Sequence, residues 1–286
     1  MVTPFDANGA LDVDEAIALA RYLVAHGSDG LVLAGSTGEG SALSDEEKCA
    51  LFAAVAEAVT VPVLAGTSSS DTARSVELTR NVAALGVAGI LATTPAYARP
   101  SQSGIAQHLA AMADATTLPV MLYDIPARTG RAIAPATTIE LVRGVSNIVA
   151  LKDASGQLAA AATTKATLGD EFDLYSGDDA LTLPFMAIGA VGVVSVCSHW
   201  AGDEMSDMVR SAASHDWETA RAINAGLAPS YAFEGSETYP NPVPAKAALR
   251  AMGLNVGQCR LPLGDSDDVL DYAAASLVST LTAHRG

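Results

Sequence analysis

The sequence predicts an α/β protein, a (β/α)8 barrel with a C-terminal helical extension. Short apolar runs alternate with longer amphipathic runs over residues 1–200. Regular alternation of strands and helices implies a parallel sheet with crossover helices. Eight such repeats in a chain of 286 residues fit a closed barrel. An open doubly wound sheet ranks lower, because the first strand–turn at residues 33–38 lacks the glycine fingerprint of a dinucleotide fold.

The predicted strands are short apolar runs bounded by glycine, proline or polar residues, as buried parallel strands are. The first of them is only the end of a strand, so the barrel's first strand looks truncated. The eight runs are 2–5, 30–34, 61–65, 89–93, 119–123, 148–152, 172–175 and 192–196.

The predicted helices begin at N-capping residues and end near glycines. Asp12 and Asp71 are caps of this kind, and Ser44 with Glu47 forms a capping box. The barrel helices are expected at 12–26, 44–59, 71–85, 103–115, 135–142, 157–168 and 180–188.

The last ninety or so residues exceed what one barrel helix needs. They predict four more helices, separated in the middle by the proline-rich connector 239–244. We therefore expect a barrel at 1–200 and a helical extension packed on it at 201–286. The extension's helices are expected at 203–215, 217–227, 244–252 and 266–283.

Composition excludes several classes of partner. The formal net charge of −16 repels phosphate backbones and anionic lipid, so neither nucleic acid nor a membrane surface is expected. No signal peptide or membrane-spanning run is visible. Three widely spaced cysteines fit a reducing cytoplasm and lack metal-ligand spacing. The five histidines are dispersed, so neither a zinc set nor a Ser/His/Asp triad is expected.

Lys152 is the strongest catalytic candidate. It ends the apolar run 148–151, and the carboxyl ends of barrel strands build the active site. Desolvation at such a position favours the free amine, which can act as a nucleophile. The other lysines, Lys48, Lys165 and Lys246, lie in helical segments and are expected on solvated faces. The alternative is a lysine that only extends its head group from the strand end to water.

Three further strand ends carry polar groups. The loop 35–40 offers backbone N–H groups and the hydroxyls of Ser36 and Thr37 to a carboxylate. The phenol of Tyr123 could move protons beside an imine, and Arg128 could hold a substrate carboxylate in a bidentate manner. Each has a structural alternative: a tight turn, a packed rim tyrosine and a surface arginine. Asp178 and Asp179 are expected to cap a helix and not to bind a metal.

Together these segments resemble the dihydrodipicolinate synthases, within the class I aldolases that include N-acetylneuraminate lyase. The resemblance covers essentially the whole chain, and the Tyr123-to-Gly130 segment favours the synthase. Its motifs are Val2-Thr-Pro-Phe5, Gly35-Ser-Thr-Gly-Glu39, Thr94-Pro-Ala-Tyr97 with Arg99-Pro100, Tyr123-Asp-Ile-Pro-Ala-Arg-Thr-Gly130, Val149-Ala-Leu-Lys-Asp153 and Ser176-Gly-Asp-Asp179.

The resemblance implies a role for each matching residue. Lys152 forms a Schiff base with pyruvate, so no cofactor or metal is expected, and Ser36 and Thr37 hold the pyruvate carboxylate. Tyr123, Tyr97 and a hydroxyl of the Ser36–Thr37 pair form a proton relay. Arg128 binds the aldehyde substrate. The positions that line the pyruvate pocket are Gly177 and Val194.

The implied reaction condenses pyruvate with L-aspartate 4-semialdehyde to 4-hydroxy-tetrahydrodipicolinate, in lysine and diaminopimelate biosynthesis. The tyrosine matching Tyr97 crosses between subunits in the family, which implies a homodimer or a dimer of dimers, a homotetramer. Another pyruvate aldolase or dehydratase acting on a sugar acid is the alternative, which Ser36 favours, and an inactive paralogue or metabolite sensor ranks third.

Three departures from the family pattern have consequences. Ser36 replaces the usual threonine but keeps the hydroxyl. Ala96, Ser70 and Arg74 replace residues of the family's lysine effector site, so we expect weak or absent inhibition by lysine. The family also has further residues before Val2, from which a truncated first strand is expected.

Overall fold

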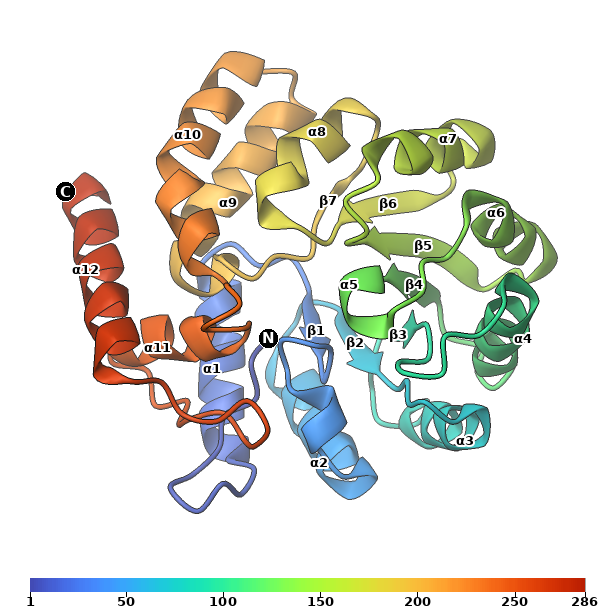
Figure 1. Ribbon diagram of the computed structural model, residues 1–286, viewed down its shortest axis with the longest axis horizontal. Helices are drawn as coiled ribbons and strands as arrows, with labels where there is room; N and C mark the ends of the chain where they lie inside the picture. Colours follow the sequence, from blue (N-terminus) through green and yellow to red (C-terminus); the bar gives the residue numbers. More distant parts are fainter. Residues whose placement is uncertain (286) are drawn as a thin grey trace. The chain divides into compact units, whose positions relative to one another are not determined.

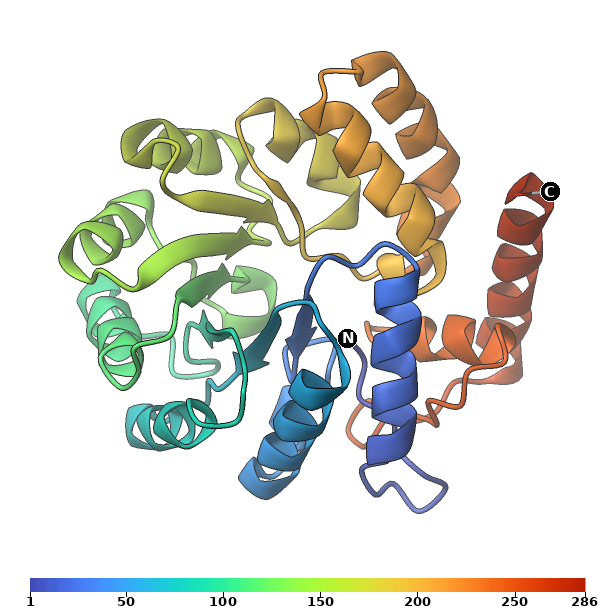
Figure 2. The same ribbon diagram turned by 180° about the vertical axis from the view of Figure 1, so that it is seen from behind.

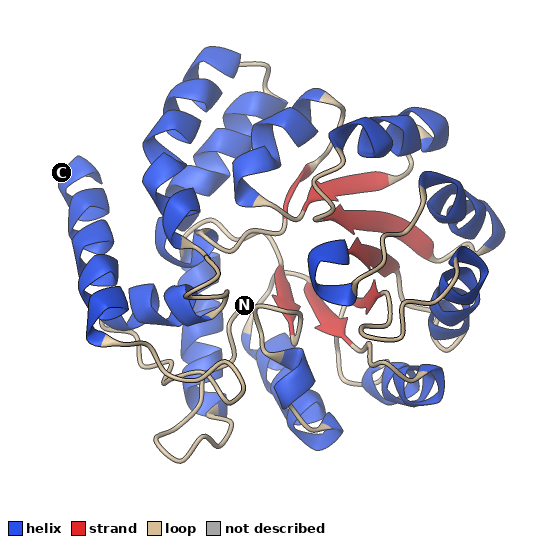
Figure 3. Ribbon diagram, viewed as in Figure 1, coloured by secondary structure: helices blue, strands red, loops and turns tan. Residues whose placement is uncertain are grey.

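The computed structural model describes residues 1–285 and forms two compact units. The first combines residues 1–61 with the chain from 196 onward, and the second is residues 62–195. Helices and strands alternate through the second unit, whereas the first unit is largely helical (Figure 3). No helix among residues 1–285 is long and apolar enough to cross a membrane.

The second unit is built on a parallel sheet whose strands follow one another in chain order (Figure 1). Most of their buried apolar residues are Val, Ile, Leu and Ala, as expected for a sheet covered by helices. The strands are β2 (Val63–Gly66), β3 (Gly89–Thr93), β4 (Val120–Asp124), β5 (Ile148–Asp153), β6 (Asp173–Ser176) and β7 (Gly192–Val193).

Helices connect these strands and lie along the outer side of the sheet, as the view from behind also shows (Figure 2). The short helix α5 (Pro126–Thr129) is an exception, because it follows β4 directly at the sheet's carboxyl edge. The remaining helices are α3 (Thr72–Val82), α4 (Gln102–Ala113), α6 (Pro135–Gly144), α7 (Leu158–Leu168), α8 (Thr182–Ala187) and the 3-10 turn η2 (Asp179–Leu181).

The first unit joins the two ends of the chain. The early helix α1 packs on α2 and α9, and α11 packs on α12 and α9. Its elements are α1 (Val13–Ala25), β1 (Leu31–Leu33), η1 (Gly40–Ala42), α2 (Asp45–Ala58), α9 (Ser198–Ala213), α10 (Trp217–Phe233), α11 (Val243–Ala251) and α12 (Asp268–Arg285).

The capping residues lie where the sequence predicts them. Asp12 accepts a hydrogen bond from the Glu15 N–H, and Ser44 and Glu47 form the reciprocal capping box of α2. Asp178 accepts from the Ala180 N–H and so begins η2, which confirms its capping role. These features are local, and a few neighbouring residues are sufficient to specify them.

The predicted first strand is wrong. Residues 2–5 form no strand, and Phe5 makes only an isolated antiparallel bridge with Leu11. The segment is held by other bonds, since the Val2 N–H donates to Nε2 of His199 at 3.0 Å. Complete burial, with the nearby terminal ammonium, lowers the pKa of His199 to about 3. The imidazole is therefore neutral and can accept that bond.

The C-terminal helices exceed their predicted lengths at two points. Helical structure begins at Ser198 and not at Asp203, and the non-helical backbone at Ala201 kinks α9 between the added residues and the predicted part. Helix α10 continues through Pro229 to Phe233, although proline commonly ends a helix. There the indole of buried Trp200 donates to the Ser230 hydroxyl and packs edge-on against Phe233, so tertiary contacts hold the extra turns.

Candidate active site

Lys152 lies on β5 with 8% of its surface exposed. Its Nζ is 4.1 Å from the centroid of the Tyr123 ring, and Tyr123 is the residue in register with it on β4. Within residues 1–285 we find no hydrogen bond or ion pair to this ammonium. A buried amine that contacts an aromatic face and no carboxylate remains available to react.

Residues in register on neighbouring parallel strands point to the same face of a sheet. One such row crosses four strands at the level of Lys152: Thr93, Tyr123, Lys152 and Tyr175. Sequence analysis did not select Tyr175. Burial raises the pKa of its phenol, and Asp173 adds to that effect, so the phenol stays protonated as a potential donor. The sequence feature that could have identified Tyr175 is its position directly before the Ser176–Asp179 motif.

Gly177 and Val194 continue from the ends of β6 and β7. The Gly177 N–H donates to the Asp153 carbonyl at 2.7 Å, and the Val194 N–H donates to the Ser176 carbonyl at 2.8 Å. A side chain on Gly177 would approach the Ala154 methyl within 2.8 Å, so only glycine fits there. The second unit thus brings Lys152, Tyr123, Gly177 and Val194 to one edge of its sheet.

Two carboxyl groups, Asp124 and Asp153, follow Tyr123 and Lys152 by one residue and are in register with each other. Asp124 accepts the Ile133 N–H at 3.1 Å, and Asp153 accepts the Ser155 N–H at 2.8 Å. Burial raises the pKa of both groups, that of Asp124 to about 7, and the Asp153 charge contributes to the Asp124 shift. Each carboxyl fixes a loop at the site, a role that sequence analysis missed.

Arg128 lies in α5 and is exposed. Two more arginines lie at this edge: the Arg99 side chain packs 3.2 Å from where a Cβ on Gly130 would be, and Arg131 donates to the Arg99 carbonyl. Gly130 has φ of 76°, which glycine adopts without strain. The arginines give a strongly acidic chain a local positive region able to attract anions.

Tyr97 extends away from its own chain. It is 97% exposed and has φ of 69°, a left-handed conformation that is uncommon for tyrosine. We find no contact between its ring and the Lys152 row within residues 1–285. An exposed aromatic ring on a residue with a strained backbone conformation suits an intermolecular contact.

Ser36 and Thr37 lie in the first unit, on the loop after β1. The loop is tightly folded, because the Gly40 N–H donates to the Gly35 carbonyl, and both Ala34 and Glu39 have left-handed φ angles. A Cβ on Gly40 would lie 2.0 Å from the Ala34 oxygen, so this turn requires glycine. Both hydroxyl residues are half-buried.

The other three lysines are not solvated, which corrects the sequence-based expectation. Lys48, Lys165 and Lys246 are 4%, 8% and 0% exposed. Lys165 donates to the carbonyls of Gly169 and Phe172 at the end of α7. Lys246 makes an ion pair with Glu39. Burial alone therefore does not distinguish Lys152 among the lysines.

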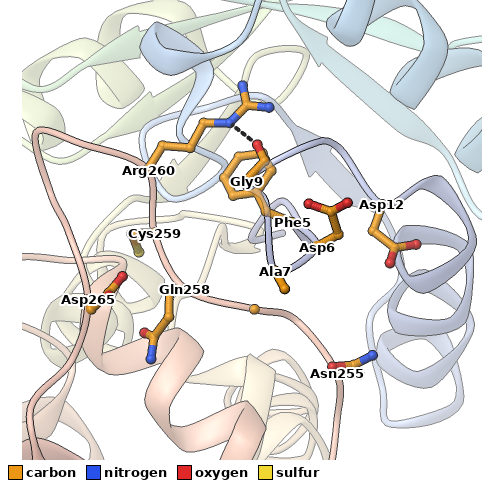
Figure 4. Close-up of a pocket in the computed structure, with 11 residues that line it drawn as sticks. Phe5, Asp6, Ala7, Gly9, Asp12, Asn255, Gln258, Cys259, Arg260 and Asp265 are labelled. Carbon is orange, nitrogen blue, oxygen red and sulfur yellow. Dashed lines mark hydrogen bonds between the residues drawn. The ribbon is translucent and has the colours of Figure 1, made fainter.

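A cavity of about 490 Å³ in the first unit contains none of these candidates (Figure 4). It lies between the N-terminal segment 5–12 and the segment 255–265, with the Arg260 side chain donating to the Gly9 carbonyl across it. Burial and Glu39 raise the pKa of its Cys259 thiol to about 12, so this cysteine is unreactive. The catalytic candidates thus lie elsewhere.

Comparison with known proteins gives a consistent assignment. The family model described as the dihydrodipicolinate synthetase family matches residues 1–281. A 4-hydroxy-tetrahydrodipicolinate synthase from Moorella thermoacetica is 49% identical over 283 residues, covering 98% of this chain and 96% of that protein.

Solved structures agree. A crystal structure of a dihydrodipicolinate synthase from Bacillus anthracis has a TM-score of 0.93 and 39% identity, covering 98% of this chain and 96% of that one. A chloride-inhibited synthase from Acinetobacter baumannii, complexed with pyruvate, has a TM-score of 0.92 and 32% identity over 98% and 96% of the two chains. These likenesses confirm the predicted fold class, an α/β barrel with a C-terminal helical part.

Proposed function

This chain belongs to the dihydrodipicolinate synthetase family, and on that premise we propose that Lys152 is its Schiff-base residue. The chain is a lyase of the 4-hydroxy-tetrahydrodipicolinate synthase type, in lysine and diaminopimelate biosynthesis. The relatives support this activity over the sugar-acid aldolase and over an inactive paralogue. The single observation that carries the assignment of Lys152 is its buried amine, 4.1 Å from the Tyr123 ring and otherwise unpaired within residues 1–285.

In the proposed reaction the Lys152 amine adds to the ketone carbon of pyruvate, and water leaves as the imine forms. Loss of a proton from the methyl carbon gives an enamine, which attacks the aldehyde carbon of L-aspartate 4-semialdehyde. The amine of that substrate then adds to the imine carbon, closes the ring and releases the lysine. The covalent intermediate serves in place of an external cofactor.

Tyr123 is the proposed proton carrier for these steps, because its ring lies against the reacting amine. A hydroxyl of the Ser36–Thr37 pair and Tyr97 would complete the relay, and the two hydroxyls would hold the pyruvate carboxylate. Arg128 would bind the carboxylate of the aldehyde substrate, and the neighbouring Arg99 supports an anion site there.

We propose a homodimer, or a dimer of dimers, in which Tyr97 enters a second subunit. The exposed ring and its left-handed backbone support this assembly. The proposed barrel covers residues 1–200 and the helical extension 201–286. The biosynthetic role and the free cysteines support a cytoplasmic enzyme.

Weak or absent inhibition by lysine is also proposed. Ser70 donates to the Ala96 carbonyl at 3.1 Å, so the hydroxyl that replaces a family effector residue is occupied within its own chain. Initial rates with added lysine test this, and half-inhibition below about 1 mM, a typical metabolite range, would contradict it.

Borohydride reduction in the presence of pyruvate tests the proposed function. Reduction of the imine should fix a pyruvate-derived adduct, and peptide mass mapping should locate it on Lys152 alone. An adduct on Lys48, Lys165 or Lys246 instead, or no adduct, would refute the mechanism. Steady-state rates with L-aspartate 4-semialdehyde, compared with N-acetylmannosamine and other sugar-derived aldehydes, then test the second substrate.

A further inference from the structure

The C-terminal region of the first unit holds the Ser36–Thr37 loop at two points. The first is a buried ion pair: Nζ of Lys246 on α11 lies 2.8 Å from Glu39, and both side chains are fully buried. The second oxygen of Glu39 accepts the Arg260 N–H at 2.8 Å, and Lys246 also donates to the Gln258 carbonyl. Because unpairing a buried charge is costly, this anchor fixes the end of the loop relative to α11.

The second point is closer to the proposed chemistry. Asn241, just before α11, donates from Nδ2 to Oγ1 of Thr37 at 2.9 Å. A hydroxyl that accepts from an amide keeps its own proton free to donate elsewhere. An anionic carboxylate accepts hydrogen bonds and cannot donate them. The direction of the Asn241–Thr37 bond therefore leaves Thr37 in the donor state that binding of pyruvate requires.

We propose that Asn241 is a positioning residue that makes the Thr37 hydroxyl a donor toward the pyruvate carboxylate, with the Glu39–Lys246 ion pair fixing its place. The proposal rests on the proposed function, because it assumes that Thr37 binds pyruvate. It gives the C-terminal helical region an indirect part in substrate recognition, through a contact between residues 204 positions apart.

The test compares two substitutions of similar size. Asn241→Asp presents acceptor oxygens in place of the amide donor, so the Thr37 proton turns toward the carboxylate side chain. Asn241→Leu neither donates nor accepts and leaves the hydroxyl free to rotate. We expect the KM for pyruvate to rise by about tenfold or more with Asp and by about threefold with Leu. The KM for the aldehyde should change by less than about twofold, a split that general destabilisation would not produce.

Asn255→Ala is the matched control. Asn255 is an exposed residue of the same region that donates to Glu15 at 3.1 Å, so its loss should leave both KM values unchanged. Melting curves of each variant check that the fold persists. In a Thr37→Val background the Asn241→Asp effect should fall below about twofold, because the bond it disturbs is gone.

The outcomes separate this inference from the proposed function. If wild-type enzyme is trapped on Lys152 and folded Asn241→Asp binds pyruvate normally, the inference fails while the function stands. If the effect persists undiminished in the Thr37→Val background, Asn241 does not act through Thr37 and the inference also fails. If wild-type enzyme gives no adduct on Lys152, the proposed function itself fails.

Discussion

Two buried lysines of this chain lie over aromatic rings at the same distance but differ in their polar partners. Nζ of Lys152 is 4.1 Å from the Tyr123 ring, and Nζ of Lys246 is 4.1 Å from the Phe5 ring. Lys246 also has a carboxylate and a carbonyl as partners. Lys152 has neither within residues 1–285.

The difference teaches that partners, and not burial, separate a reactive lysine from a structural one. Burial lowers the pKa of Lys246, and the Glu39 charge opposes this, so the ammonium is kept within an ion pair. A paired ammonium has no lone pair with which to attack a ketone. At Lys152 the neighbouring aromatic group carries a hydroxyl that can exchange protons, and Phe5 does not.

The largest expected effect comes from Lys152→Met. Removing the amine removes the covalent intermediate, so kcat should fall by at least about 10⁴-fold while the melting temperature changes little. Steady-state rates and borohydride trapping measure this. A variant that retains trapping would show that another lysine reacts, and the comparison between the two regions would fail.

Lys246→Met should have the opposite profile. It leaves the Glu39 carboxylate buried without its partner, at a cost of about 3–5 kcal/mol in the free energy of unfolding. Denaturant titration measures this. Lys165→Met is the control, because its main partners are carbonyls and no buried charge is left unpaired, so its loss should cost about 2 kcal/mol. An equal loss in both would remove the special status of the Glu39–Lys246 pair.

Tyr123→Phe gives Lys152 the same kind of ring that Lys246 has. The ring and its contact remain, but the hydroxyl is lost, so kcat should fall by about 10²-fold while trapping still occurs on Lys152. Stopped-time borohydride trapping follows imine formation separately from turnover. Unchanged kcat would exclude the phenol from the proton relay.

Asp124→Asn tests, through the pH dependence of stability, whether burial at the end of β4 raises the pKa of Asp124. The folded pKa of Asp124, about 7, lies above its ordinary value of 3.8, so its contribution to stability is complete below about pH 4 and lost as pH rises toward 7. The asparagine does not titrate and can still accept the Ile133 N–H.

The stability advantage of Asp124→Asn should therefore grow with pH, by up to about 1.4 kcal/mol per unit between pH 4 and 7. Urea titrations at several pH values measure it. The exposed Asp29→Asn controls for removing one negative charge. A difference that is flat with pH would show that Asp124 is charged throughout this range.

Much of the fold could be predicted because its signals are local. Capping residues, short apolar runs and the alternation of strands with helices each need only a few neighbours, and Asp12, Ser44 and Asp71 cap the helices as expected. The errors arise where distant contacts dominate. Residues 2–5 form no strand, and Val2 bonds to His199 instead. The Trp200–Ser230 bond supports a helix that continues past Pro229.

The sequence by itself determined that Lys152 lies near the end of a buried strand, because a short apolar run followed by polar residues locates that end without any other part of the chain. It also indicated the family, because each family motif is a short continuous run of residues. Only the tertiary structure decided which lysines have partners, because Glu39 and Lys246 come together when the two chain ends fold against each other. Strand register likewise places Asp124 beside Asp153. Electrostatic environment depends on groups far apart in sequence, and no local pattern contains it.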